Sequence, residues 1–337
     1  AVREGERGLG VAMGDEDRVG GTGPHRGGSP TNALPESAGV APRVNTKGRG
    51  RGVMVSGEAA IDYAVIAARK DQVVRRMWTG LKGLVGKNKV EWVAGRGRLE
   101  EPGKVRIRLH GEDGTPGAGG ERVLEATDVS LATGSRVKRL PGSTPDGVRV
   151  LASDDVLRRV EVPARMVIVG AGAVGCEFAS CFHDLGVQVT LLEYLPAIVP
   201  LEDRDVSKEL ERSFRRRGIE LVTSARFEAS SLVVGEAGIR LTVGPEGGEA
   251  KEVAADVLLV AAGRAANIED LGLETTRVAT DRGIIVVDGP MRTAEPPVWA
   301  SCDLAGGLWL APTRAADGRH ERPTGRGRPD RPPPRAR

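Results

Sequence analysis

Aromatic residues, cysteines and long apolar runs are all scarce in this chain of 337 residues. Phe, Trp and Tyr make up only 3% of it, so a core must be built from aliphatic side chains, which suits buried parallel strands covered by helices. No stretch reaches the roughly 18 uninterrupted apolar residues of a membrane span, so we expect no integral membrane protein. The three cysteines, Cys176, Cys181 and Cys302, are too few for a disulfide scaffold and indicate a reducing, cytoplasmic compartment.

A targeting leader is also not recognisable, and the chain does not begin with Met, so we expect a processed start or a fragment. The net charge of +3 comes from 49 Lys and Arg against 46 Asp and Glu. Residues 313–337 carry eight Arg and three acidic residues, a local charge of +5, which leaves −2 for residues 1–312. Because the body is nearly neutral, we expect no nucleic-acid binding by it.

Composition divides the chain into three regions. Residues 1–52 are rich in Gly, Arg and Pro and show little periodicity beyond the apolar run Leu9–Met13. Residues 61–310 alternate apolar runs, helical patterns and turn signals, which is typical of an α/β protein. From Thr313 onward the Arg, Pro and Gly composition predicts a disordered tail. Such a tail could bind RNA or an acidic partner, or it could be a GC-rich gene read out of frame.

Within the middle region, the spacing of apolar residues predicts one long helix over Gly57–Leu84. Lys89–Val93 and Lys104–Leu109 alternate like strands and are separated by Gly-rich turns. We further predict a short strand over Val129–Ala132 and a helix around Asp154–Arg159.

One motif is specific. A buried-strand run, Met166–Val169, leads into the G-x-G-x-x-G string Gly170–Gly175, a helix to Leu185 with Gly186 as its cap, and a strand over Val187–Leu192 that ends at Glu193. This order is the dinucleotide-binding fingerprint, in which the first glycine permits the turn, the second admits the pyrophosphate and the third allows close packing. The helix N-terminus offers N–H groups to the phosphates. Glu193 would accept hydrogen bonds from the adenosine ribose and repel a 2′-phosphate, which favours NAD over NADP.

Two other patterns do not carry the same weight. Gly8-Leu9-Gly10 has no strand before it, and Met13 stands at the third glycine position. Cys176 and Cys181 lie five residues apart on the predicted helix, about 140° apart around its axis, so they are expected to be buried packing residues.

Further matches occur in a fixed order along the chain. They are GGT at Gly20–Thr22, PT-AL at Pro30–Leu34, ATGS at Ala132–Ser135, LVAAGRAAN at Leu259–Asn267, RT at Arg292–Thr293 and VWASCDLAGG at Val298–Gly307. With the motif above, they make residues 15–312 resemble the flavin-dependent pyridine nucleotide-disulfide oxidoreductases, in particular the dihydrolipoamide dehydrogenase family. The resemblance implies an α/β fold of two Rossmann-like dinucleotide-binding units. An NAD unit (151–270) is inserted into a partial FAD unit (1–150 with 271–312), and the family's C-terminal interface domain is missing.

The resemblance also assigns site residues. Those of the FAD site are Asp15, Gly20, Gly21, Thr22, Asn32, Gly97, Thr133, Gly134, Ser135, Asp303, Leu310 and Ala311, with Asp15 on the FAD ribose and Asp303 on the ribityl and phosphate region. Those of the NAD site are Gly170, Ala171, Gly172, Ala173, Val174, Gly175, Glu177, Glu193, Phe227 and Gly263. Glu177 would lie near the nicotinamide and flavin rings. The four histidines show no metal-ligand spacing, and we expect no metal.

Departures from the family pattern bear on activity. Gly23 and Gly28 stand where the family has its two redox cysteines, Asn32 replaces a lysine, and Cys302 replaces a glycine. The opening strand and Gly-rich loop of the FAD unit and the His-Glu acid–base pair are not found. Because glycine has no thiol, the dithiol half-reaction cannot run on this chain, and no catalytic residue of it is retained.

In the intact family, dihydrolipoamide reduces the disulfide, electrons pass to FAD, and hydride leaves to NAD⁺. The partners that the resemblance implies are NAD(H), the lipoamide-bearing acyltransferase of a 2-oxoacid dehydrogenase complex, and a second subunit of a homodimer. Two alternatives stay open for this chain: an NADH-to-flavin diaphorase and a non-catalytic NAD-binding module.

Overall fold

The structure, a computed structural model, describes residues 1–307 and 309 except 49–50, 54–55, 58, 246–247 and 249. The predicted tail at 313–337 and the candidate residues Leu310 and Ala311 lie outside the described residues. Contacts divide the chain into two compact units. Unit 1 comprises residues 1–23, 78–136 and those from 265 on, and unit 2 comprises residues 24–77 and 137–264. The predicted boundaries at 150, 270 and 312 concern which cofactor each segment binds, and they stay predictions.

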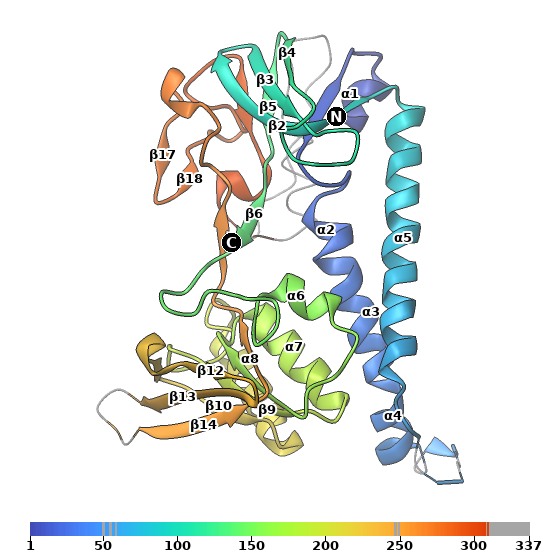
Figure 1. Cartoon of the computed structure of the whole chain (residues 1–337), viewed down its shortest axis with the longest axis vertical. Helices are drawn as coiled ribbons and strands as arrows, with labels where there is room; N and C mark the ends of the chain where they lie inside the picture. Colours follow the sequence, from blue (N-terminus) through green and yellow to red (C-terminus); the bar gives the residue numbers. More distant parts are fainter. Residues whose placement is uncertain are drawn as a thin grey trace. The chain divides into compact units, whose positions relative to one another are not determined.

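Unit 2 is built on a five-stranded parallel sheet with the order β10-β9-β8-β15-β7. Figure 1 labels β9 and β10 of this sheet. Its strands are β7 (Val150–Leu151), β8 (Arg165–Val169), β9 (Gln188–Leu192), β10 (Glu220–Val222) and β15 (Val257–Val260). Its helical segments are α3 (Gly28–Ala38), α4 (Val40–Pro42), the π-helix η1 (Arg43–Lys47), α6 (Ser153–Arg158), α7 (Ala173–Asp184), α8 (Arg204–Arg217) and the 3-10 turn η3 (Ala229–Ser231). An antiparallel sheet adds β11 (Ala225–Phe227), β12 (Val233–Gly235), β13 (Gly238–Pro245) and β14 (Lys251–Ala255).

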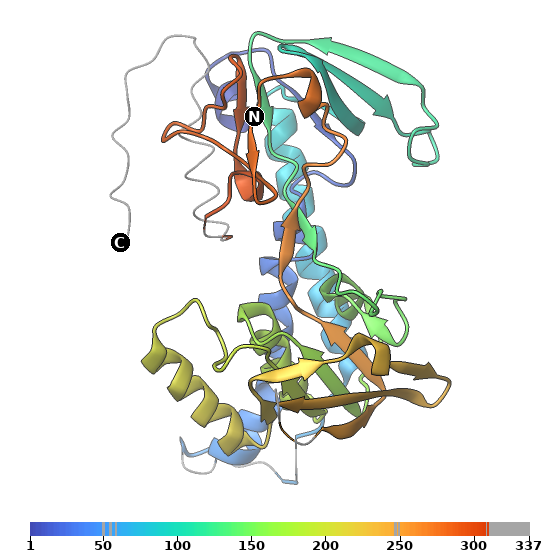
Figure 2. The same ribbon diagram turned by 90° about the vertical axis from the view of Figure 1, so that its left-hand side faces the viewer.

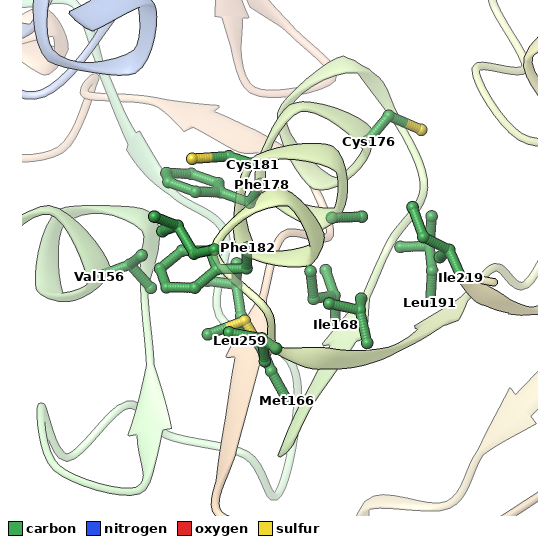
Figure 3. Packing of buried hydrophobic residues seen from close by; sticks show 14 of the residues in the cluster. Val156, Met166, Ile168, Cys176, Phe178, Cys181, Phe182, Leu191, Ile219 and Leu259 are labelled. Carbon is green, nitrogen blue, oxygen red and sulfur yellow. The ribbon is translucent and has the colours of Figure 1, made fainter. Parts of the chain in front are cut away.

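The central strand β8 is buried on both faces, as its unbroken apolar sequence predicts. Met166 and Ile168 belong to the cluster that includes Phe182 of α7 (Figure 3). Val167 and Val169 point to the other side, into a cluster shared with β13. Successive side chains of a strand alternate between faces, so one short run supplies both cores.

The helix α7 contributes most of its apolar residues to the first cluster. Phe178 and Phe182 are buried with their ring centroids 6.3 Å apart. Cys176 and Cys181 are free thiols and are buried there too, which confirms that they pack rather than pair (Figure 3).

Unit 1 holds a four-stranded sheet with the order β1-β2-β3-β4, in which β1 and β2 are parallel and the other pairs antiparallel. The strands β2, β3 and β4 are drawn in cyan to green in Figure 2. These strands are β1 (Ala12–Asp15), β2 (Glu91–Glu101), β3 (Lys104–Leu109) and β4 (Glu121–Glu125). Two-stranded sheets pair β5 (Val129–Leu131) with β19 (Val298–Ala300), and β17 (Thr280–Asp281) with β18 (Ile284–Ile285). Unit 1 also contains α1 (Val2–Glu6) and the 3-10 turns η4 (Leu273–Thr275) and η5 (Cys302–Ala305).

Four elements have residues in both units. They are α2 (Thr22–His25), α5 (Tyr63–Lys87), β6 (Ser135–Val137) and β16 (Arg264–Ala266), the last two of which pair with each other.

Local structure differs from the sequence patterns in three places. Residues 1–48 show little periodicity but form helices and a strand; in α3, Pro30, Ala33, Leu34 and Ala38 make one buried face despite Pro35 within the helix. The predicted helix over 57–84 begins instead at Tyr63 and runs to Lys87, since the Asp62 carboxylate accepts a hydrogen bond from the Val65 N–H and starts it there.

The strand predicted over Lys89–Val93 also differs, because it starts at Glu91 and continues through two glycines to Glu101. A Cβ on Gly95 would lie 2.4 Å from the Arg108 carbonyl oxygen. This glycine therefore serves close strand approach and does not mark a turn.

Candidate dinucleotide site

The glycine-rich loop that follows β8 is shaped by close backbone contacts. Gly170 has a φ of +99°, and a Cβ on it would lie 2.5 Å from the Ala261 carbonyl oxygen. A Cβ on Gly175 would lie 1.8 Å from the Gly170 carbonyl oxygen. Nothing lies within 4 Å of a Cβ built on Gly172. The first and third glycines are thus required by the fold of the loop, and the second leaves open space beside it.

That open space adjoins the N-terminus of α7. Gly172 is the N-cap of this helix and supplies no side-chain hydrogen bond to it. The first N–H groups of a helix have no partner within the helix, and the macrodipole places partial positive charge there. A 12-residue helix that starts at a bare glycine suits the phosphates of a dinucleotide.

Glu193, at the end of β9, lies against this loop. It is 7% exposed, its Oε2 accepts the Ala171 N–H at 2.7 Å, and its Oε1 accepts the Leu195 N–H at 2.9 Å. Each carboxylate oxygen can accept a further hydrogen bond. The side chain therefore fixes the loop and puts a negative charge beside it.

The other predicted NAD residues lie on neighbouring segments. The Ala261 N–H donates to the Val169 carbonyl at 2.8 Å, which brings the segment leading to Gly263 next to the loop. Gly263 has a φ of +101° and open space around it. Phe227, on β11, packs against the cluster on the β13 side of the sheet. Their assignment to an NAD site stays a prediction.

Glu177 lies one turn into α7, beside α3. With Thr31, Leu34 and Phe178 it lines a small apolar cavity. The apolar surroundings raise the pKa of its carboxyl, although the residue keeps solvent access.

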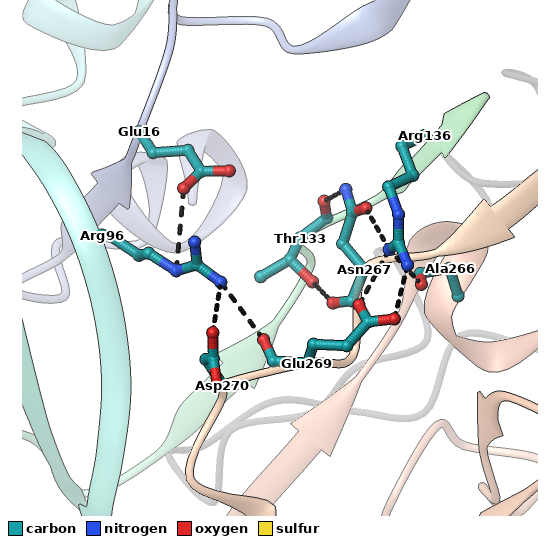
Figure 4. A network of polar contacts seen from close by, with 8 residues as sticks. All are labelled: Glu16, Arg96, Thr133, Arg136, Ala266, Asn267, Glu269 and Asp270. Carbon is teal, nitrogen blue, oxygen red and sulfur yellow. Dashed lines mark hydrogen bonds and ion pairs between the residues drawn. The ribbon is translucent and has the colours of Figure 1, made fainter. Parts of the chain in front are cut away.

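Hydrogen bonds join several of the predicted FAD residues of unit 1. The Ser135 hydroxyl donates to the Asp303 carboxylate. Thr133 and Asn267 exchange hydrogen bonds, the Thr133 hydroxyl donating to the Asn267 carbonyl at 2.6 Å and the Asn267 amide to the Thr133 carbonyl at 2.9 Å (Figure 4). Gly134, with a φ of +69°, accepts the Asn267 N–H at 2.9 Å.

The remaining candidates of the FAD site lie on β1, β2, α3 and the segment that leads into α2. Asp15 ends β1 and accepts the Asp17 N–H at 3.0 Å, and Gly97 lies within β2. Gly20, Gly21 and Thr22 lead into α2, with positive φ at both glycines. Asn32 is exposed on α3, in unit 2. The described part of unit 1 contains no counterpart of the strand, G-x-G-x-x-G loop and helix of unit 2.

Sequence reasoning missed the side chain that completes the Thr133 network. Arg136 donates to the Ala266 carbonyl, to the Asn267 Oδ1 and to the Glu269 carboxylate (Figure 4). An arginine on a short strand gives no local signal for such a contact, because its partners lie about 130 residues further along the chain.

The positions expected to hold redox cysteines have room for a side chain. Gly23 lies in α2 and Gly28 begins α3, and nothing lies within 4 Å of a Cβ built on either. The two cysteines of α7 offer no substitute, since burial raises the pKa of both the Cys176 and Cys181 thiols to about 12.

A parallel sheet with a glycine-rich loop and a buried acid at the ends of adjacent strands is the arrangement found in dinucleotide-binding α/β proteins. The family described as pyridine nucleotide-disulphide oxidoreductase matches residues 1–318, and the chain belongs to this family. Its members depend on flavin and NAD(P). This membership confirms the family and the oxidoreductase class that the sequence predicts.

Individual relatives support the same assignment. Dihydrolipoyl dehydrogenase of Bacillus subtilis is 35% identical over 320 residues, which are 94% of this chain and 67% of that protein. Dihydrolipoyl dehydrogenase 3 of Pseudomonas aeruginosa is 37% identical over 314 residues, which are 92% of this chain and 65% of that protein. The chain thus spans about two thirds of the length of these relatives.

Solved structures show the same fold. LpdA from Mycobacterium tuberculosis superposes with a TM-score of 0.82 at 28% identity, over 95% of this chain and 67% of that one. The HOCl-induced flavoprotein disulfide reductase RclA from Escherichia coli, as its Cu(II) complex, gives 0.77 at 25% identity, over 94% and 66%. Among the described residues, no helix is both long and apolar enough to cross a membrane.

Proposed function

We propose that this chain is a dihydrolipoyl dehydrogenase-like protein that retains the NAD(H) end of the chemistry and lacks the dithiol end. The observation that supports this most directly is the cradle in unit 2. It combines open space at Gly172, the uncapped start of α7 and the buried Glu193 carboxylate.

These residues fit NAD(H). The backbone of Gly170–Gly175 and the N-terminus of α7 would hold its diphosphate, and Glu193 would accept hydrogen bonds from the adenosine ribose. When bound, the nicotinamide supplies hydride donation or acceptance. The negative charge of Glu193 disfavours a 2′-phosphate, so NADH is the preferred form.

Support for FAD is narrower. In unit 1 the carboxylates of Asp15 and Asp303 can accept hydrogen bonds from hydroxyls. The hydroxyl of Ser135, which follows Gly134 in the chain, donates to the Asp303 carboxylate. The described residues of this unit offer no glycine-rich loop for a diphosphate. Binding of FAD is therefore supported only by family membership, whereas binding of NAD(H) is supported by family membership and by the geometry of unit 2.

On this proposal the chain does not turn over dihydrolipoamide. Gly23 and Gly28 hold no thiol, so no disulfide can accept electrons from the lipoamide group of an acyltransferase partner. We also propose for this chain the homodimer of the intact family.

Calorimetric titration of the purified chain with NADH and NADPH tests the proposal. We expect NADH to bind more tightly than NADPH, and the Gly172→Ala variant to lose at least about tenfold in NADH affinity because its methyl group occupies the space for the diphosphate. Absence of NADH binding by the folded chain would refute the proposal.

Two activity assays complete the test. Dihydrolipoamide-dependent reduction of NAD⁺ is expected to be undetectable, and measurable turnover would contradict the missing dithiol end. A bound-flavin absorbance together with NADH-driven dye reduction would instead establish the diaphorase alternative.

A further inference from the structure

Four arginines share one face of the sheet in unit 1. On β2 and β3 the register sets Arg96 directly opposite Arg108 and Arg98 directly opposite Arg106. The opposite face carries Leu99 and other apolar residues that enter the core. Like charges directly opposite each other on neighbouring strands are destabilising, so this arrangement is not explained by strand pairing.

Carboxylates neutralise two of these arginines closely. Arg106 lies 2.6 Å from Glu100 and 2.7 Å from Glu121, and Arg98 contacts Glu274. All three pairs join side chains that are each partly exposed.

The other facing pair is held more loosely. Arg96 is 50% exposed and reaches Asp270 at 3.3 Å and Glu16 at 3.9 Å (Figure 4). Arg108 faces Glu121 in the register of β3 with β4, but that carboxylate is bound to Arg106. Within the described part of the chain Arg108 has no ion pair. Arg96, with its weak ion pairs, thus lies opposite Arg108, for which the described residues offer no ion pair.

These side chains line a cavity of about 320 Å³, together with Glu121 and Asp270. We propose that this cavity binds a small soluble anion that carries two phosphate groups, with Arg96 and Arg108 as its principal ligands. Guanidinium groups bind phosphate oxygens through paired N–H donors. The volume exceeds that of a diphosphate, so a diphosphate with an organic substituent also fits.

The ion pair that Arg96 makes with Asp270 is weak. Both side chains are largely exposed, and such pairs contribute little to stability, so a multivalent anion can displace Asp270. A monovalent anion such as chloride cannot bridge Arg96 and Arg108 through paired N–H···O bonds, as an anion with two phosphate groups can. We therefore expect diphosphate to bind and chloride not to compete at equal concentration.

Calorimetric titration with inorganic pyrophosphate tests the proposal. The Arg96→Gln/Arg108→Gln double variant is expected to lose at least about tenfold in affinity, since it removes both guanidinium groups that make charge-assisted hydrogen bonds to the phosphates. Arg122→Gln is the matched control. It removes one arginine from β4 that pairs with Glu91 instead of lining the cavity, and we expect it to bind pyrophosphate as the parent does.

Pyrophosphate can also bind at the glycine-rich loop of unit 2, so the Gly172→Ala variant is titrated in parallel. The proposal requires that this variant keep the arginine-dependent binding. If Gly172→Ala abolishes all binding while the double arginine variant leaves it unchanged, the proposal is wrong. Absence of binding to the parent chain refutes it equally.

A stability measurement separates loss of binding from loss of fold. Without ligand, Arg108→Gln relieves the repulsion from Arg96, so we expect its midpoint of unfolding to equal or exceed that of the parent. A lower midpoint would show that Arg108 supports the sheet, which contradicts its assignment as a ligand.

Discussion

Replacement of Gly175 by alanine tests the close packing on which the candidate site depends. The new Cβ would lie 1.8 Å from the Gly170 carbonyl oxygen, 3.0 Å from its carbon and 3.5 Å from the Ala261 Cβ. The first two atoms are backbone, so no side-chain rotation relieves the clash. Forced overpacking of this kind destabilises by about 1–3 kcal/mol, and the distance places this case at the upper end.

Alanine also has a higher helix propensity than glycine, by about 1 kcal/mol in a helix interior. This gain offsets part of the clash in the first turn of α7. We therefore expect Gly175→Ala to lower the free energy of unfolding by about 2 kcal/mol. Gly172→Ala is the matched control, because open space surrounds its Cβ; as alanine is a poorer N-cap residue than glycine, we expect a loss of only about 0.5–1 kcal/mol, clearly less than for Gly175→Ala.

The assay is urea unfolding followed by far-ultraviolet circular dichroism and by tryptophan fluorescence. All four tryptophans, Trp78, Trp92, Trp299 and Trp309, lie outside residues 24–77 and 137–264 of unit 2. The circular dichroism transition should therefore move more than the fluorescence transition. Equal stability of Gly175→Ala and the parent, or an equal loss in Gly172→Ala, would refute the reasoning.

Three further outcomes concern the two cysteines of α7, Glu177 and Glu193. Because the thiol pKa of Cys176 and Cys181 is raised to about 12, their thiolate fraction at pH 8 is on the order of one in ten thousand. A thiol reagent should then modify only the partly exposed Cys302 in the native chain and all three cysteines in denaturant, and rapid native reaction of all three would contradict the packing of α7. Glu177 has a folded-state pKa above the ordinary 4.5, so its contribution to stability is present below pH 4.5 and is lost as pH rises through the folded pKa. In urea unfolding, Glu177→Gln should thus have a higher free energy of unfolding than the parent at pH 7 and an equal one at pH 4. If the difference in this free energy is the same at both pH values, the pKa of Glu177 is not raised in the folded chain. Glu193→Gln replaces one of the two accepting oxygens by an NH2 group, which cannot accept a hydrogen bond from the Ala171 or Leu195 N–H. The variant should have a free energy of unfolding lower by about 1–3 kcal/mol. It should also have a smaller ratio of NADH affinity to NADPH affinity than the parent. Unaltered stability and an unaltered cofactor ratio in calorimetry would exclude this role.

Much of unit 2 could be predicted from the sequence because its signals are local. The strands β8 and β9 and the helix α7 follow from local patterns: an apolar run, three glycines at fixed spacing and a helical stretch. The same spacing identifies Glu193 as the acid after the second strand. The burial of Cys176 and Cys181 follows from the same helical periodicity. Each of these features depends on residues within about thirty positions of one another.

Contacts between distant segments were decided only by tertiary structure. Gly95 and Gly97 were expected in a turn, and they lie within β2 because β3 approaches closely there. The helix α3 has a buried face that proline and small residues conceal in the sequence. In each case, packing against a distant segment overrides the local preference.

The sequence by itself therefore determined the family, the glycine-rich loop after β8 and the two positions without thiols. Only the tertiary structure decided that Glu193 closes onto the Ala171 N–H and that Arg96 faces Arg108 across two strands. The physical reason is that a motif records spacing along one segment, whereas strand register and side-chain contact are set when separate segments pack together.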